Sequence, residues 1–434
     1  MSSGEFSILG SLANIGGFLS TPFCGYALDK FGRKYSAMVY GVPFVVAWGI
    51  IAVTKSMYLD IFGAGLAGLG AGGQAVSTVY ISEICHDSIR GGLTSSTIYV
   101  FFLGLLFSYT LGGYLPYYSV VYVHLILSIL YVALLTLLKE SPIFLLKCGK
   151  EKEAAESIAF YHRIEKNSKE MELKIKKLKL QLDPRIIKIL ESGGDDAAVE
   201  ELLKKSPSTT EKDDESLSVW QFLKRSESSR KGLATVHILM VLSIFMGAMV
   251  ISLYAELIFK EAVPGLDTNT CSIILAGIYL IACLMGALVL DKFGRKTLMT
   301  VSCALCGVFT MLLGSQLHFH YAPPWFSAFA LYAFSFTYNF GCAAIPSVVA
   351  AEIFLPEVRG FGNSCVMACR WISVFVLLNI FAPLVEAFGL GITYCFFSVV
   401  CFLSAAYSHL YLPETKGLSV DAIQKLFVKE RTKK

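Results

Sequence analysis

Charged residues recur in a fixed pattern along the chain, at the ends of long apolar segments. The hexapeptide Asp-Lys-Phe-Gly-Arg-Lys occurs at 29–34 and is repeated unchanged at 291–296, and the pattern Glu-x6-Arg-Gly occurs at 83–91 and 352–360. Acidic and basic side chains at the ends of neighbouring helices can form ion pairs that hold the helices together. The charged positions that we expect to pair are Asp29, Arg33, Glu83, Arg90, Asp291, Arg295, Glu352 and Arg359.

Glycines accompany these charges. Gly32 and Gly294 suit a tight turn between two helices, because glycine adopts backbone conformations that other residues avoid. Gly25 would let two helices approach closely, and its counterpart Ala287 is also small.

The simplest alternative for the charged positions is that they only set topology and hold helices together. The repetition of two acidic positions favours a more specific role.

Other motifs in the sequence do not indicate an enzyme. Cys303 and Cys306 form a C-x-x-C, but their neighbours are apolar and no second ligand pair follows. Residues 63–68 match the G-x-G-x-x-G fingerprint, yet they lie inside an apolar segment rather than between a strand and a helix, so packing of small residues between helices explains them better. No Ser/His/Asp grouping or phosphate-binding loop stands out, and we expect no catalysis, cofactor or metal.

The composition predicts that most of the chain lies in a lipid bilayer. Hydrophobic residues make up 55% of the 434 residues, charged residues 16%, and the mean hydropathy is +0.61. A spanning helix needs about 20 mostly apolar residues. Eleven segments meet this requirement: 7–28, 35–54, 59–82, 93–114, 118–138, 233–259, 270–290, 297–316, 323–350, 362–385 and 390–411. We therefore expect an all-α membrane protein, with no nucleic-acid partner.

Residues 139–232 form a hydrophilic segment between five spans and six. This segment holds 20 of the 37 Lys and Arg residues and 18 of the 33 Asp and Glu residues, and its spacing at 150–189 favours short amphipathic helices before a flexible linker. If it is cytoplasmic, 34 of the 37 basic residues are cytoplasmic, and so is the C-terminus. The positive-inside rule therefore favours this orientation.

The internal repeat predicts that one helix is missing at the front. The repeated hexapeptide follows two spans in the second half of the chain but only one span in the first half. Eleven spans with a cytoplasmic C-terminus would also put the N-terminus outside. We therefore expect 11 spans of an original 12.

These motifs together resemble the sugar-porter family of the major facilitator superfamily. They are Gly25-x3-Asp29-x2-Gly-Arg-Lys with its copy, the two Glu-x6-Arg-Gly loops, Glu-Ser-Pro at 140–142 and Pro-Glu-Thr-Lys-Gly at 413–417. Within that family the chain is most similar to insect facilitated trehalose transporter-like proteins. The resemblance implies two pseudo-symmetric helix bundles around a central cavity that opens to each side of the membrane in turn, with the paired charges as a cytoplasmic gate.

The resemblance also implies a division of the chain. The N-terminal bundle is 1–138 (family spans 2 to 6), the cytoplasmic loop is 139–232, the C-terminal bundle is 233–411 (spans 7 to 12), and the cytoplasmic tail is 412–434. The implied function is facilitative transport of a carbohydrate such as trehalose or a hexose, in the plasma membrane. Proton coupling and oligomeric state stay open.

The expected cavity departs from the family pattern. Positions that carry amides in the family are occupied by other residues, and an arginine precedes the tryptophan at 371. The candidates for contact with a small-molecule solute are Tyr109, Ser243, Met249, Tyr254, Tyr279, Asn339, Arg370 and Trp371. These changes favour two alternatives: a carrier of the same fold for a non-sugar solute, or a non-transporting sensor or receptor.

Arg370 is the most informative departure, because a full charge in mid-membrane is costly and usually faces a cavity or a partner. Its candidate partners are Glu256 and a bound anionic substrate. The alternative is that it extends to the membrane surface or pairs structurally with Glu386.

Overall fold

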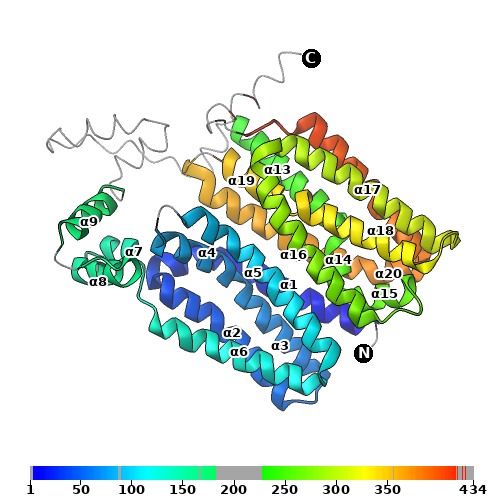
Figure 1. Ribbon diagram of the computed structural model, residues 1–434, viewed down its shortest axis with the longest axis horizontal. Helices are drawn as coiled ribbons and strands as arrows, with labels where there is room; N and C mark the ends of the chain where they lie inside the picture. Colours follow the sequence, from blue (N-terminus) through cyan, green and yellow to red (C-terminus); the bar gives the residue numbers. More distant parts are fainter. Residues whose placement is uncertain are drawn as a thin grey trace.

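The computed structural model describes residues 3–86, 89–165, 168–181, 227–354 and 356–416, with isolated positions at 418, 423 and 426. Most of the predicted tail, 412–434, and much of the predicted flexible linker lie outside these residues. Within them the chain is helical, as the sequence predicts. Figure 1 shows two helix bundles side by side, the N-terminal one in blue to cyan and the C-terminal one in green to red.

The N-terminal bundle is built from long helices with short connections. Its elements are α1 (Ser3–Phe31), α2 (Arg33–Val53), α3 (Met57–Leu69), η1 (Gly70–Gly72), α4 (Gly73–Ile84), α5 (Arg90–Tyr114) and α6 (Tyr117–Leu137). The predicted span 59–82 is therefore broken at η1, a short 3-10 turn. Glycines allow close packing here: a Cβ on Gly68 would lie 2.0 Å from the carbonyl oxygen of Ala13, so the small-residue interpretation of 63–68 is confirmed.

Three shorter helices follow the N-terminal bundle. They are α7 (Pro142–Lys147), α8 (Glu151–His162) and α9 (Lys169–Gln181), and they lie beyond one end of α4 in Figure 1. The expected short helices of the hydrophilic segment are therefore present. We call this end of the bundles the α8 side and the other end the opposite side.

The C-terminal bundle contains more interrupted helices. Its elements are α13 (Glu227–Phe245), α14 (Ala248–Leu253), α15 (Ala255–Ala262), α16 (Thr268–Phe293), α17 (Arg295–Phe319), α18 (Pro324–Thr337), the π-helix η2 (Tyr338–Cys342), α19 (Ile345–Ile353) and α20 (Pro356–Tyr411). The predicted span 233–259 is divided at Gly247, which has φ 92°. The last two predicted spans both lie in α20, which is kinked at Gly389.

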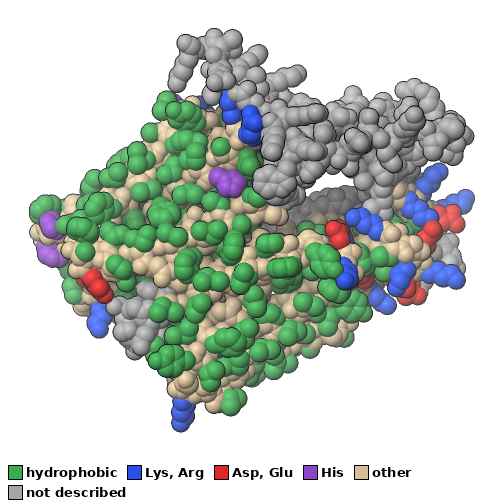
Figure 2. All heavy atoms as spheres, turned by 180° about the vertical axis from the view of Figure 1, so that it is seen from behind, with side chains coloured by type: hydrophobic (Ala, Val, Ile, Leu, Met, Phe, Trp, Pro, Cys, Tyr) green, Lys and Arg blue, Asp and Glu red, His purple; other side chains and the backbone are tan. Residues whose placement is uncertain are grey.

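The surface fits a bilayer. Figure 2 shows hydrophobic side chains over most of one face of the bundles, with charged side chains gathered near the ends. Seven helical segments among the described residues are long and apolar enough to cross a membrane. The count of eleven spans stays a prediction.

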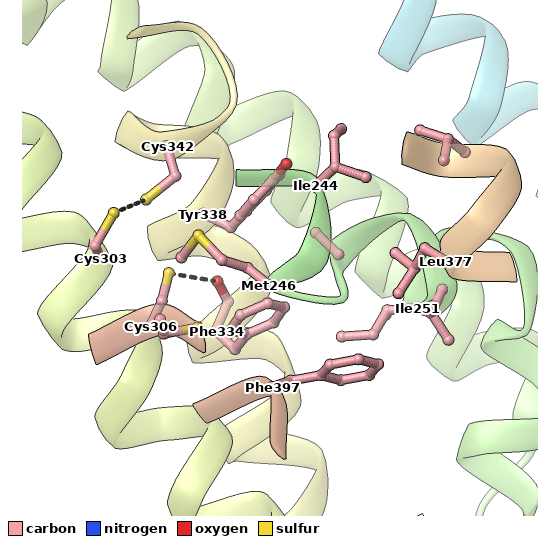
Figure 3. Packing of buried hydrophobic residues seen from close by; sticks show 14 of the residues in the cluster. Ile244, Met246, Ile251, Cys303, Cys306, Phe334, Tyr338, Cys342, Leu377 and Phe397 are labelled. Atoms are coloured by element: carbon pink, nitrogen blue, oxygen red, sulfur yellow. Dashed lines mark hydrogen bonds between the residues drawn. The ribbon is translucent and has the colours of Figure 1, made fainter. Parts of the chain in front are cut away.

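Figure 3 shows the core of the C-terminal bundle, where Tyr338 lies among apolar side chains such as Ile244 and Met246. Cys303 is in contact with Cys342, at 3.5 Å between the sulfur atoms, so its nearest thiol partner is on η2 rather than within the C-x-x-C. This core fixes η2 against α17.

Candidate functional site

The N-terminal hexapeptide ends α1 and begins α2 on the α8 side. Gly32 separates the two helices with φ 87°, so the predicted tight turn is present. The guanidinium of Arg33 then reaches Glu83 at the end of α4, with Nε donating to Oε2 and Nη2 to Oε1, both at 2.7 Å. The two side chains are only 6% and 11% exposed, and this fork geometry is the strongest form of an ion pair.

Glu140 completes this network from the end of α6. Its carboxylate accepts hydrogen bonds from the backbone N–H groups of Arg33 (2.8 Å), Lys34 (3.1 Å) and Ser141 (2.8 Å). Arg33 and Lys34 are the first residues of α2, where unpaired N–H groups and the helix dipole favour an anion. The hydroxyl of Ser141 donates to Glu83 and so closes the network.

The C-terminal bundle contains a copy of this network. Arg295 donates to Oε1 of Glu352 from Nε at 3.0 Å and from Nη2 at 2.9 Å. Glu414 accepts from the backbone N–H of Arg295 at 2.8 Å, and the Thr415 hydroxyl donates to Glu352. Gly294 has φ 82° and occupies the place of Gly32. We call these two sets of residues the N-network and the C-network.

Sequence reasoning found half of each network. It singled out the Arg and Glu of each ion pair, but it gave no role to Glu140, Ser141, Glu414 or Thr415. The signal was available, since Glu-Ser and Glu-Thr each follow the last apolar segment of a half. The partner of Glu140 could not be identified from the sequence, because the helix that Glu140 caps begins 107 residues earlier in the chain.

Other residues of the predicted set lie elsewhere. Asp29 is exposed to solvent, and the side chains of Arg90, Asp291 and Arg359 lie outside the described residues. The predicted close approach at Gly25 is wrong, because a Cβ there would have no neighbour within 4 Å. The surface of α1 at this position is simply open.

The short helices are attached to the N-network. The hydroxyls of Tyr80 and Tyr161 both donate to the carbonyl oxygen of Lys139, and Ser157 donates to the carbonyl of Glu140. Tyr161 lies on α8, where burial raises the pKa of its hydroxyl above the ordinary value, only partly offset by its hydrogen bonds. The platform formed by α7 and α8 is thus fixed to the end of α6.

Hydrogen bonds join the two bundles from their middle to the opposite side. Asn379 donates to the Ser11 hydroxyl at 2.7 Å, and Asn269 donates to the carbonyl oxygen of Gly113 at 3.3 Å. At mid-height the indole N–H of Trp371 donates to the Thr21 hydroxyl at 3.0 Å. Each Arg–Glu pair, in contrast, lies within one bundle.

A cavity of about 620 Å³ lies beside this junction, within the usual range for small-ligand sites. Trp371 of α20 lines it from the C-terminal bundle, and polar groups from α4, α5 and α6 line it from the N-terminal bundle. These polar groups are Gln74, Ser77, Thr97, His124 and Ser128. Gln74 and His124 are not among the candidates that the sequence predicted. Their lining position was missed because a polar residue in a span does not show which side it faces.

Most of the predicted cavity candidates are packed inside the bundles instead. Ser243, Tyr254 and Tyr279 are at most 4% exposed. Tyr279 accepts a hydrogen bond from Ser252, and the carbonyl of Ser252 accepts one from Tyr109, so these aromatic rings form part of the junction between the bundles. Ser243, Tyr254 and Tyr279 were predicted to line an open cavity. They are packed in the interior instead, which corrects that prediction.

The remaining candidates are partly buried. Met249 packs against the C-terminal core, and the amide of Asn339 donates to the carbonyl of Ser335 on its own helix. Arg370 lies one residue before Trp371, close to Tyr338. Of the predicted set, Trp371 and Arg370 therefore carry polar groups at the level of the junction without being fully buried.

Two pseudo-symmetric helix bundles with copied networks define a multi-pass membrane transporter of the major facilitator fold. The model of the family described as "Sugar (and other) transporter" matches residues 2–427, and the chain belongs to this family. The family is one of transporters and not of enzymes.

Curated relatives are similar over nearly the whole chain. A protein named facilitated trehalose transporter Tret1 from Polypedilum vanderplanki is 25% identical over 97% of this chain and 79% of its own length. The Aedes aegypti protein of the same name is 24% identical, and the chain spans only 49% of its length. The sugar transporter ERD6 from Arabidopsis thaliana is 24% identical over 98% of this chain and 80% of its own length.

Solved structures have the same fold. The inward-open conformation of the xylose transporter XylE from E. coli superposes with a TM-score of 0.75 at 19% identity and covers 98% of this chain and 91% of XylE. A partially occluded inward-open conformation of the same transporter gives 0.70 at 18% identity, covering 95% and 91%. At these identities the likeness shows the fold alone.

Proposed function

We propose that the protein carries a sugar or a related polyol across a membrane by alternating access. One observation supports this most directly. Each Arg–Glu network ties together helices of a single bundle, whereas the bundles meet where α1 packs against α20 and α5 against α16, with hydrogen bonds toward the opposite side. Each bundle can therefore move as a unit about this junction.

The orientation is part of the proposal. The excess of basic residues in 139–232 supports a cytoplasmic α8 side, with the C-terminus on that side and the plasma membrane as the location. The networks then act as the cytoplasmic gate residues, and the division into 1–138, 139–232, 233–411 and 412–434 follows. The names of relatives, a facilitated trehalose transporter and a sugar transporter, support trehalose or another sugar as substrate.

A cross-link across the junction tests the mechanism. A Cβ on Gly113 would lie 3.1 Å from the Cβ of Asn269, slightly closer than the usual spacing of a disulfide, so Gly113→Cys with Asn269→Cys needs only a small adjustment. In proteoliposomes supplied from outside with labelled trehalose or D-glucose, the oxidised double variant should lose at least about nine-tenths of uptake. Reduction with dithiothreitol should restore it.

The single cysteine variants are the matched controls, since each keeps the substitution without the cross-link. They should transport normally under oxidising and reducing conditions. Uptake that continues in the fully cross-linked protein would contradict alternating access at this junction. Failure of wild-type protein to transport any sugar tested would instead favour a sensor or a different substrate class.

A further inference from the structure

Arg370 lies at the centre of the buried face of α20. On a helix, residues four, seven and eleven positions apart share a face. Arg370 shares its face with Val366, Val374, Leu377 and Phe381, all of which are at most 5% exposed. The guanidinium therefore points into the protein and not toward lipid.

The side chain also lies too deep to reach the membrane surface. α20 begins 14 residues before Arg370 and is kinked 19 residues after it, which corresponds to about 21 Å and about 28 Å along the helix axis. An arginine side chain extends only about 7 Å, so the polar head cannot lie at either surface. The predicted alternative of a charge that reaches the membrane surface does not fit this geometry.

No carboxylate in the described part of the chain neutralises Arg370. Glu386 is 16 residues further along the same helix, which is about 24 Å away. Glu256, the other predicted partner, is exposed on α15. The polar neighbour of Arg370 is Tyr338, whose hydroxyl lies 3.4 Å from that of Ser243.

Arg370 is nevertheless partly exposed as a residue, in the middle of a face whose other members are buried. The next residue, Trp371, lines the cavity between the bundles and bonds to α1. An unpaired cation at this depth is costly unless it faces a cavity where an anion can bind.

We infer that Arg370 is the anion-binding residue of the solute site and that the preferred solute is a small hydroxylated organic anion, a sugar acid or a sugar phosphate. The inference rests on the proposed transport by alternating access and places an anionic sugar derivative before the neutral sugars as the preferred solute. The guanidinium pairs with the carboxylate or phosphate of the solute, and the polar groups that line the cavity beside Trp371, such as Gln74 and Thr97, suit a hydroxylated body. Neutral sugars lack the group that neutralises the charge.

Binding to purified full-length protein in nanodiscs tests this inference. D-glucuronate and D-glucose 6-phosphate should bind at least about tenfold more tightly than D-glucose or trehalose, and the better of the two anions identifies the charged group. Arg370→Gln should weaken binding of that anion by about 10- to 100-fold and change glucose binding by less than about threefold. Arg370→Lys should bind that anion more weakly than wild type but more tightly than Arg370→Gln, because lysine keeps the charge but loses the forked geometry of the guanidinium.

Lys260→Gln is the matched control, since it removes one positive charge from an exposed site on α15. It should leave anion binding unchanged. If Arg370→Gln does not fold, ligand-induced thermal stabilisation of the wild-type and Arg370→Lys proteins still compares anion with neutral sugar. Equal or better binding of neutral sugar, or unchanged anion binding in Arg370→Gln, would overturn the inference. Anion binding without uptake in proteoliposomes would leave the site intact and reject the transport function.

Discussion

The N-network and the C-network use the same residue types at matching places but differ in how tightly they are held. Arg33 engages both oxygens of Glu83 at 2.7 Å, and its guanidinium also lies 5.4 Å from the ring of Phe144. Arg295 directs two nitrogens at one oxygen of Glu352, at 2.9 and 3.0 Å. The exposed fractions are 6% and 11% in the first pair and 12% and 25% in the second.

This difference shows that duplication kept the chemistry while the surroundings changed its strength. The N-network is covered by α7 and α8, which are bonded to the carbonyls of Lys139 and Glu140. Burial strengthens an ion pair with good geometry and makes it more damaging to break. We therefore expect the N-network to stabilise its bundle more than the C-network does.

The largest effect should come from removing one cation. Arg33→Ala leaves the buried Glu83 without its partner and should lower the free energy of unfolding by about 3 to 5 kcal/mol, whereas Arg295→Ala should cost about 1 to 3 kcal/mol. Unfolding by SDS titration in detergent micelles measures both. The double variant Arg33→Ala/Glu83→Ala should recover part of the loss. Equal losses in the two single variants would contradict the comparison.

Substituting either of the two turn glycines should also destabilise the protein. Gly32→Ala and Gly294→Ala place a Cβ at positive φ, and that Cβ would lie 2.6 Å and 2.5 Å from the capping carboxylates of Glu140 and Glu414. The backbone strain alone is about 1 to 2 kcal/mol, and the displaced carboxylate adds to it. Both variants should lose about 2 to 3 kcal/mol in the same titration. Gly149→Ala, at φ 74° with no neighbour, is the control for strain without a clash.

The sequence predicted the fold and the ion pairs because both depend on local or repeated patterns. Apolar length gives helices, and the repeated hexapeptide and Glu-x6-Arg-Gly place Arg33 and Glu83 at helix ends. The caps could not be predicted, since Glu140 meets α2 only after the bundle closes. The cavity was largely mispredicted, because the rings of Tyr254 and Tyr279 fill the core instead of facing a cavity.

A smaller effect should follow from neutralising the caps. Glu140→Gln keeps one acceptor oxygen for the first N–H groups of α2 but loses the charge that favours a helix N-terminus, which should cost about 1 to 2 kcal/mol. Glu414→Gln should cost the same amount or less, since Glu414 also accepts from three backbone N–H groups but belongs to the more exposed network. Asp29→Asn, at an exposed site on α1, should change stability by less than about 0.5 kcal/mol. A larger loss for Glu414→Gln would reverse the order of the two networks.

The smallest effect should come from the contact between α8 and the N-network. Tyr161→Phe removes the hydrogen bond to the carbonyl of Lys139, at 2.7 Å, and should cost about 0.5 to 1.5 kcal/mol. Because burial raises the pKa of Tyr161 in the folded protein, the unfolded chain ionises first. The contribution of the protonated Tyr161 hydroxyl to the free energy of unfolding is therefore complete below about pH 10. It declines as the pH rises through the pKa of Tyr161 in the folded protein. Wild type and Tyr161→Phe, titrated at pH 8 and pH 11, should thus converge at the higher pH. A constant difference would show that ionisation of Tyr161 is not linked to folding.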